Sequence, residues 1–148
     1  METMTITMNS HQLKEHATRE NSTLLFDSEN KIVAVRWSGK VKKETAAYLL
    51  GIGASLVESD SATKILLNRA DLEEFPKDTR EWIRQDLLKN TGRRLAHKVE
   101  KVATIKSNTE MGSLYSNVIS SAIKIMFPRL KVVHFDDERS ALDWFLSE

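Results

Sequence analysis

Short apolar runs and helically spaced apolar residues alternate along this chain. The runs at residues 23–26 and 31–37 lie on either side of a polar turn, and the second is rich in β-branched and aromatic residues, so together they predict a β-hairpin. Similar runs at residues 64–68, 99–105 and 131–135 predict three further strands, and the polar residues that follow the first of these, through Glu74, predict a loop. The pattern therefore predicts five short strands.

Apolar residues at helical spacing predict four helices between and after these strands. They cover residues 42–58, a stretch that begins near Asp78 and ends or kinks near Gly92, residues 111–126, and residues 139–146 after an acidic start. Asp78 and Glu81 have the spacing of a capping box, in which an acid caps the helix and a glutamate follows three residues later. The third helix has the clearest apolar period of the four.

The resulting order of elements is β-β-α-β-α-β-α-β-α, which predicts one α/β domain over residues 23–148. Strands that alternate with helices favour a mostly parallel five-stranded sheet with flanking helices, and the opening hairpin adds one antiparallel edge strand. Residues 1–22 are polar without a steady period, so we expect a flexible N-terminal tail there.

Composition narrows the class of protein. The 148 residues are 41% hydrophobic and 29% charged with a formal net charge of +1, which is typical of a globular domain and does not favour nucleic acid as a partner. The absence of cysteine excludes disulfides, thiolate catalysis and cysteine-ligated metals, and fits a cytoplasmic protein. We expect no membrane span and no signal peptide, because no stretch approaches about 20 apolar residues and the N-terminus lacks a basic start before an apolar run.

Three segments resemble the STAS superfamily, and more closely the bacterial STAS/SEC14-type proteins related to the spore anti-anti-sigma factor. Residues 31–41 (KIVAVRWSGKV) match its strand, glycine and first helix, residues 64–68 (KILLN) its central strand, and residues 134–145 (HFDDERSALDWF) its closing strand, acidic turn and last helix. The resemblance implies a five-stranded sheet flanked by helices. It also implies a regulatory, non-enzymatic role through binding of a protein partner.

The resemblance further implies a phosphoacceptor. Regulatory members of the family present a serine, in an Asp-Ser pair, at the start of the second helix, and Asp78-Thr79 is the counterpart here. A phosphate on Thr79 would meet free backbone N–H groups and the positive end of the helix dipole. Alternatively, Asp78 and Thr79 only cap the helix. Arg80, Glu81 and Trp82 stand where the family carries small residues and glycine.

One basic cluster is a candidate surface for phosphate, an acidic lipid headgroup or an acidic partner. It lacks the interleaved aromatic residues that binding of single-stranded nucleic acid favours. Alternatively, it is a solvated helix end, where cations face the negative end of the dipole. The cluster comprises Lys89, Arg93, Arg94, His97, Lys98 and Lys101.

Large apolar side chains offer candidate binding surfaces. Trp82 and Trp144 mark a partner or homodimer interface if they are exposed, and belong to the core if they are not. The apolar stripe at residues 111–126 either packs on the sheet or lines a pocket for an apolar ligand.

Ionisable residues do not form a catalytic pattern. His134 and Asp136 share one face at a strand end and offer two metal ligands, with an ordinary strand histidine and a capping aspartate as the favoured alternative. His11 and His16 fall in the expected tail. We therefore expect no catalytic residue, no metal and no cofactor.

Three functions remain, and each predicts a different structure. A regulatory module that binds a protein should have a packed interior and an exposed apolar patch near the second or last helix. A carrier or sensor of a small apolar or lipid-like ligand should enclose an apolar cavity of at least about 300 Å³. An enzyme should gather polar groups in a cleft at the carboxyl ends of the strands. We rank the protein-binding module first.

Overall fold

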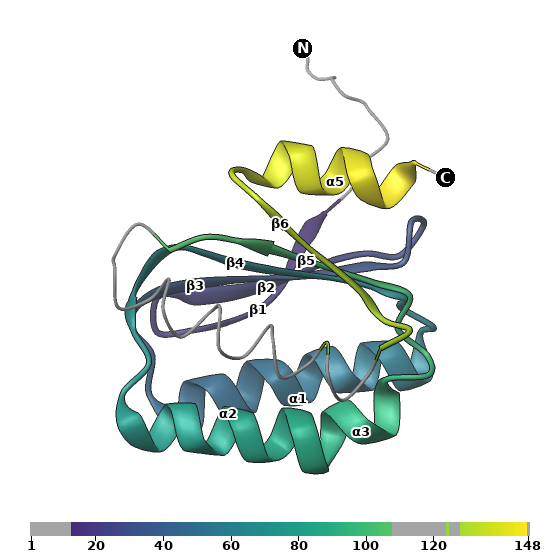
Figure 1. The fold of residues 1–148 in the computed structure, drawn as a ribbon. Helices are drawn as coiled ribbons and strands as arrows, with labels where there is room; N and C mark the ends of the chain where they lie inside the picture. The colour runs from purple at the N-terminus through teal and green to yellow at the C-terminus, as the bar shows by residue number, and fades with distance from the viewer. Residues whose placement is uncertain (1–12, 108–123, 125–127, 148) are drawn as a thin grey trace.

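Six strands form one sheet, and strands that are neighbours in the chain are neighbours in the sheet (Figure 1). The computed structural model describes residues 13–107, 124 and 128–147. Within these residues the strands are β1 (Lys14–Arg19), β2 (Ser22–Asp27), β3 (Ile32–Lys40), β4 (Lys64–Glu74), β5 (Lys101–Ile105) and β6 (Lys131–Phe135). The β1–β2 and β2–β3 pairs are antiparallel, and β3 to β6 are parallel. The predicted α/β fold is confirmed, with six strands in place of five.

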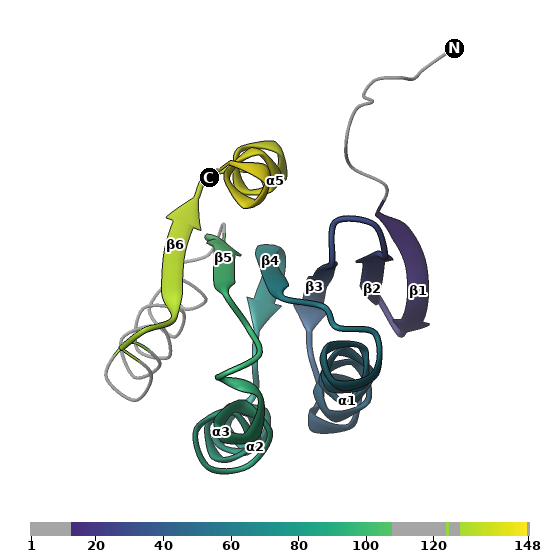
Figure 2. The same cartoon turned by 90° about the vertical axis from the view of Figure 1, so that its right-hand side faces the viewer.

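Helices cover both faces of this sheet (Figure 2). α1 (Lys43–Ser59), α2 (Lys77–Lys89) and α3 (Thr91–Leu95) lie on one face, and α5 (Glu138–Leu146) lies on the other. Each face buries its own apolar cluster, with Leu49 of α1 in the first and Phe145 of α5 in the second. Because the inner strands are covered on both sides, residues 32–35 of β3 are buried without alternation.

The strand β1 corrects one part of the flexible tail that was expected over residues 1–22, because residues 14–19 form a strand, while residues 1–12 lie outside the described residues. Residues 14–19 pair antiparallel with β2, from Lys14 opposite Phe26 to Arg19 opposite Ser22, with one irregularity between Glu15 and Ala17. Most of the β1 side chains are exposed. The strand is therefore stabilised mainly by backbone hydrogen bonds to β2, which leave no apolar period in the sequence.

The strand β4 extends past the predicted end at residue 68, and the expected polar loop through Glu74 is wrong. β4 continues beside β3 to Glu74, with a register shift that places Ser38 opposite Asp71. Leu72 is buried in this extension, and its carbonyl accepts a hydrogen bond from the Ser107 hydroxyl at 2.9 Å. One buried leucine among charged neighbours is too weak a pattern to predict a strand.

The helix α2 begins one residue before Asp78, but the predicted capping box does not form. Pro76 is the N-cap and makes no side-chain cap bond. The Asp78 carboxylate instead accepts from the backbone N–H of Thr79 at 3.0 Å. The helix stops at Asn90 (φ −115°, ψ −95°), and the short α3 follows directly, so the interruption predicted near Gly92 lies two residues earlier.

The last strand and helix match their predicted positions. β6 has the bounds expected from the sequence. At the start of α5 the Asp137 carboxylate accepts from the backbone N–H of Ser140 at 2.8 Å, which lowers the pKa of Asp137. The acidic start of this helix therefore works as an N-cap.

The helix predicted at residues 111–126 lies outside the described residues, Lys124 excepted. Among the residues that the structure does describe, no helix is both long and apolar enough to cross a membrane.

Candidate functional site

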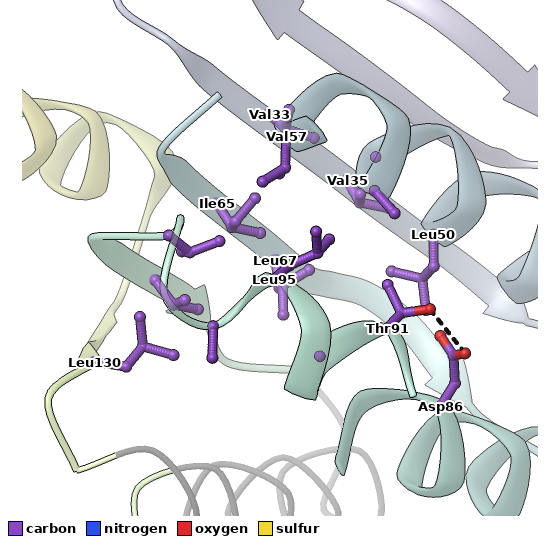
Figure 3. A pocket seen from close by; sticks show the side chains of 16 residues that line it. Val33, Val35, Leu50, Val57, Ile65, Leu67, Asp86, Thr91, Leu95 and Leu130 are labelled. Carbon is purple, nitrogen blue, oxygen red and sulfur yellow. Dashed lines mark hydrogen bonds between the residues drawn. The ribbon is translucent and has the colours of Figure 1, made fainter. Parts of the chain in front are cut away.

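An apolar cavity of about 140 Å³ lies between α1, α3 and the sheet (Figure 3). The strands β3, β4 and β5 supply its floor, with Val35, Leu67 and Val102 among the lining side chains. Leu50 and Val57 of α1 lie on one side. Gly53 of α1 faces the sheet, where an added Cβ would lie in ordinary van der Waals contact, 3.6 Å from Leu24 and 3.7 Å from Val33.

Two polar side chains belong to the described lining, and they bond to each other. The Thr91 hydroxyl donates to the Asp86 carboxylate at 2.9 Å, across the break between α2 and α3 (Figure 3). The remaining described lining residues are glycine or aliphatic. The cavity can therefore hold an apolar group, and its polar edge lies at a discontinuity of the helical layer.

Arg69 on β4 is a buried cation, only 5% exposed. Its Nε has no hydrogen-bond partner, and among the described residues no carboxylate pairs with its guanidinium. Burial lowers the pKa of Arg69 to about 10, so the side chain is still charged at neutral pH. Arg69 follows the cavity residue Leu67 by two positions, which places both side chains on the same face of the strand.

His134 lies beside this cation at the carboxyl end of β6. Its Nδ1 is in hydrogen-bond contact with the hydroxyl of the buried Thr104 on β5. Burial lowers the pKa of His134, and nearby positive charges lower it further: Arg69, Lys124 and Lys106. The imidazole is therefore neutral at pH 7.

Among the described residues, no third metal ligand joins His134 and Asp136. Asp136 is exposed, and the described residues contain no group of three or more histidine, cysteine or acidic side chains that could hold a metal ion. His16 lies on β1, with its ring 6.1 Å from that of Phe26. His11 lies outside the described residues.

The candidate phosphoacceptor Thr79 is fully buried in this conformation. Its hydroxyl donates to the Val41 carbonyl at 2.9 Å, between the end of β3 and the first turn of α2. Asp78 beside it is exposed. A kinase can reach the Thr79 hydroxyl only if the start of α2 moves away from Val41.

The basic cluster is divided between two faces of the molecule. Arg94 makes a bidentate ion pair with Glu58 of α1, with both bonds at 3.1 Å. Lys101 donates to the carbonyls of Trp144 and Ser147, where it closes the carboxyl end of α5. The side chains that stay exposed near α3 are Lys89, Arg93, His97 and Lys98.

Both candidate interface tryptophans are half-buried. Trp82 packs against the core beneath α1 and α2. Trp144 contacts Phe135 and Phe145, each with ring centroids 5.5 Å apart, and carries the Lys101 ammonium 4.9 Å from its ring centre. The large apolar side chains that the described residues do expose are Tyr48 at 44% and Val133 at 37%.

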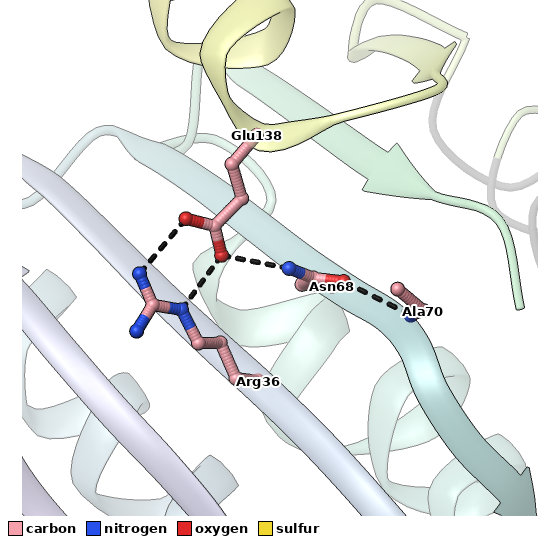
Figure 4. Close-up of polar contacts among 4 residues, drawn as sticks. All are labelled: Arg36, Asn68, Ala70 and Glu138. Atoms are coloured by element: carbon pink, nitrogen blue, oxygen red, sulfur yellow. Dashed lines mark hydrogen bonds and ion pairs between the residues drawn. The ribbon is translucent and has the colours of Figure 1, made fainter.

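A polar junction fixes α5 to the sheet (Figure 4). The Arg36 guanidinium of β3 donates to both carboxylate oxygens of Glu138, at 2.8 and 2.9 Å, and the Asn68 amide donates to Glu138 at 2.7 Å. Burial alone would raise the pKa of Glu138, but these hydrogen bonds outweigh it and hold the pKa below its usual value. The same contact raises the pKa of Arg36.

A comparison with solved structures finds a protein from Shewanella loihica PV-4, described as an uncharacterized protein of the DUF3478 family with a SpoIIAA-like fold. The TM-score is 0.55 with 18% sequence identity, over 93% of this chain and 98% of that chain. The fold is SpoIIAA-like. This confirms the fold that the STAS resemblance implied, while no family model and no curated protein matches the sequence.

The junction at Glu138 makes the stability of this SpoIIAA-like fold depend on pH. The folded pKa of Glu138 is lowered, so its contribution is fully present above the unfolded pKa of about 4.3 and is lost as the pH falls through the folded value. We expect Glu138→Gln to lose about 1 kcal/mol of unfolding free energy at pH 7, a figure reduced because Arg36 is half-exposed. The variant should also lose less stability than the wild type below about pH 4.3.

Urea unfolding of both proteins at pH 7 and in acid measures this difference. Asp143→Asn on the same helix is the control, because Asp143 is exposed. If the unfolding free energies of the wild type and Glu138→Gln fall equally as the pH is lowered into the acid range, protonation of Glu138 is not coupled to folding through this junction.

Neither Arg69 nor the junction residues of this SpoIIAA-like fold were predicted from the sequence. With the strand predicted to end at residue 68, Arg69 fell in an expected polar loop. A strand continued to Glu74 would have placed Arg69 on the buried face with Leu67, where a charged residue calls for explanation. Nothing in local spacing links Arg36 to Glu138, which are 102 positions apart.

Proposed function

We propose that this chain is a non-enzymatic regulatory module that senses a small apolar ligand. The observation that supports this proposal is the apolar cavity between α1, α3 and the sheet. Burial of apolar surface is favourable by about 25 cal/mol per Å². A complementary ligand would therefore gain free energy there without any catalytic group.

The size of the cavity limits how much of a ligand it can hold. At about 140 Å³ it is well below the about 300 Å³ expected of a carrier or sensor that encloses its whole ligand, so it would take only part of one. An engineered apolar cavity of about 150 Å³ in another protein stays dry and binds benzene. The buried part of the ligand would accordingly be about as large as one aromatic ring.

The break between α2 and α3 offers a way to transmit binding. Asp86 and Thr91 line the cavity and bond to each other across Asn90, which lies in neither helix. A ligand that contacts this edge would favour one arrangement of α3 over another. The equilibrium between the two arrangements would then shift by an amount set by the difference in their affinities for the ligand. A change of helix position on the outer surface is a signal that a protein partner can detect.

Ala96→Leu tests the cavity directly, because Ala96 lines it at the end of α3 and is only half-buried. We expect the larger side chain to fill the space, raise the unfolding free energy by about 0.5–2 kcal/mol and weaken binding of benzene at least about ten-fold. Urea unfolding gives the stability, and NMR titration with benzene gives the affinity.

Ala47→Leu is the matched control, since Ala47 is half-buried on α1 and is not among the residues that line the cavity. The control should bind benzene as the wild type does. Equal benzene affinity in Ala96→Leu and Ala47→Leu would refute the cavity as the binding site.

A second candidate function is the recognition of a protein partner through α1 and β1. Tyr48 of α1 is 44% exposed, and the Arg19 guanidinium lies 5.7 Å from its ring centre. Tyrosine and arginine are the residues most often found at the energetic centre of protein interfaces. The exposed Lys89, Arg93 and Lys98 near α3 are a separate basic surface, whose charge would favour an acidic partner.

The two candidates differ in what stays bound when the protein is recovered from its native cell. A sensor should bring down a small molecule that Ala96→Leu does not retain. A protein-binding module should bring down the same partner with either protein. Mass spectrometry of the recovered proteins and of extracted small molecules separates these outcomes.

A further inference from the structure

The unpaired guanidinium of Arg69 is the least expected chemical feature of the described residues. The side chain is 5% exposed, its Nε makes no hydrogen bond, and no described carboxylate forms an ion pair with it. Buried charges are normally paired, because removal of an ion from water costs several kcal/mol that only a partner offsets. Among the described residues, Arg69 therefore has no carboxylate as the counter-ion that a buried arginine requires.

Arg69 lies close to the apolar cavity. Leu67 lines the cavity, and Arg69 is the next residue of β4 on that face, about 6.6 Å further along the strand. Thr104 is opposite Leu67 in the neighbouring strand, and His134 is opposite Thr104. Arg69, Thr104 and His134 are not themselves lining residues, but they lie next to the lining residue Leu67, toward the carboxyl ends of the strands.

The charge in this region is positive. Arg69, Lys106 and Lys124 all act on His134 with the same sign. The described residues supply no acid that is bonded to Arg69, Thr104 or His134. An anion that entered from the cavity would meet a desolvated cation with no carboxylate partner among the described residues, and such sites bind charge more strongly than exposed ones.

We propose that Arg69 binds an oxyanion, and that the cavity ligand is a small apolar acid. The apolar body, about the size of one aromatic ring, fills the cavity, and its carboxylate or phosphate group pairs with the Arg69 guanidinium. For the apolar part of the ligand, this inference rests on the proposed function of the cavity as a sensor site. The planar guanidinium suits either group, because its N–H donors match two oxygens at once.

Three probes with the same ring test the proposal: 3-phenylpropanoate, the uncharged 3-phenylpropanol and 2-phenylethyl phosphate. Two carbons separate the ring from the charged group in both anions, and the alcohol replaces the carboxylate of 3-phenylpropanoate by CH₂OH, so all three extend from the cavity toward Arg69. We expect the wild type to bind at least one of the two anions about 10- to 100-fold more tightly than the alcohol, the usual effect of a hydrogen bond to a charged group. Arg69→Met should bind the alcohol as the wild type does and lose the preference. Calorimetry measures the affinities, and the stronger anion identifies the group.

The NMR signal of the Arg69 Nε–H in the wild type gives a reading that needs no variant. A shift of this signal with an anion but not with the alcohol supports the binding of an oxyanion by Arg69. This holds even if the alcohol does not bind, a result that would exclude the apolar cavity as a ligand site. Equal affinities for anions and alcohol, with an unmoved Nε–H signal, overturn the proposal and leave the sensor function standing. Sodium chloride at matched ionic strength controls for salt.

Discussion

Replacement of Thr79 by aspartate is expected to destabilise the protein by about 3–5 kcal/mol, the usual cost of an uncompensated buried charge. Thr79 is fully buried, and its hydroxyl satisfies the Val41 carbonyl at 2.9 Å. Aspartate at this position would bury a carboxylate and remove the donor on which that carbonyl depends. Chemical denaturation of the two proteins measures the loss.

Two matched variants separate burial from charge. Thr79→Ser keeps the hydroxyl and should lose much less stability. Lys77→Asp places the same acid in the exposed first turn of α2, where the helix dipole favours it, so little change is expected.

The outcome also bears on the hypothesis that Thr79 is a phosphoacceptor. A large loss means that a modified Thr79 must coexist with displacement of the start of α2, so phosphorylation would act by opening this turn. If Thr79→Asp proves as stable as the wild type, the turn already opens at little cost, and a phosphate could be added without a change of fold.

Arg69→Met is expected to have the opposite effect from Thr79→Asp. In the absence of ligand it should raise the unfolding free energy by about 1–4 kcal/mol. Replacement of buried ionic groups by apolar side chains of similar size is often stabilising to this extent. For Arg69 the gain is not reduced by the loss of an ion pair, since no described carboxylate bonds to it. Urea unfolding at neutral pH, where the pKa of about 10 keeps the guanidinium charged, is the measurement.

Arg36→Met provides the contrast, because Arg36 is also a strand arginine but forms a bidentate pair with Glu138. This control should lose stability. If Arg69→Met also loses stability, Arg69 has a favourable partner in the free protein. Arg69 would then not need a ligand anion as its counter-ion.

The fold was predictable where side-chain burial leaves a period in the sequence. The hairpin of β2 and β3, the helix α1 and the strand β6 all bury one face or both, so their apolar residues recur at regular intervals. The strand β1 and the second half of β4 depend more on backbone pairing and on single buried residues such as Leu72. Such features carry little local pattern, and both were missed.

The candidate site was less predictable than the fold, because it is defined by position in three dimensions. Arg69 is an ordinary residue in the sequence and becomes unusual only through its burial on β4. The basic cluster shows the reverse, since Arg94 and Lys101 look like neighbours in the sequence but contact Glu58 and the end of α5. The burial of Thr79 likewise depends on Val41, 38 positions away.

The strand order of the sheet has a consequence for how the chain is made. Because the strands are arranged β1-β2-β3-β4-β5-β6, each new strand that leaves the ribosome can be added to the free edge of those already formed. No strand has to be inserted between two others, so each step closes either a hairpin or a single crossover connection. We expect the sheet to assemble progressively during synthesis, in contrast to folds that must wait for their last strand to complete the centre.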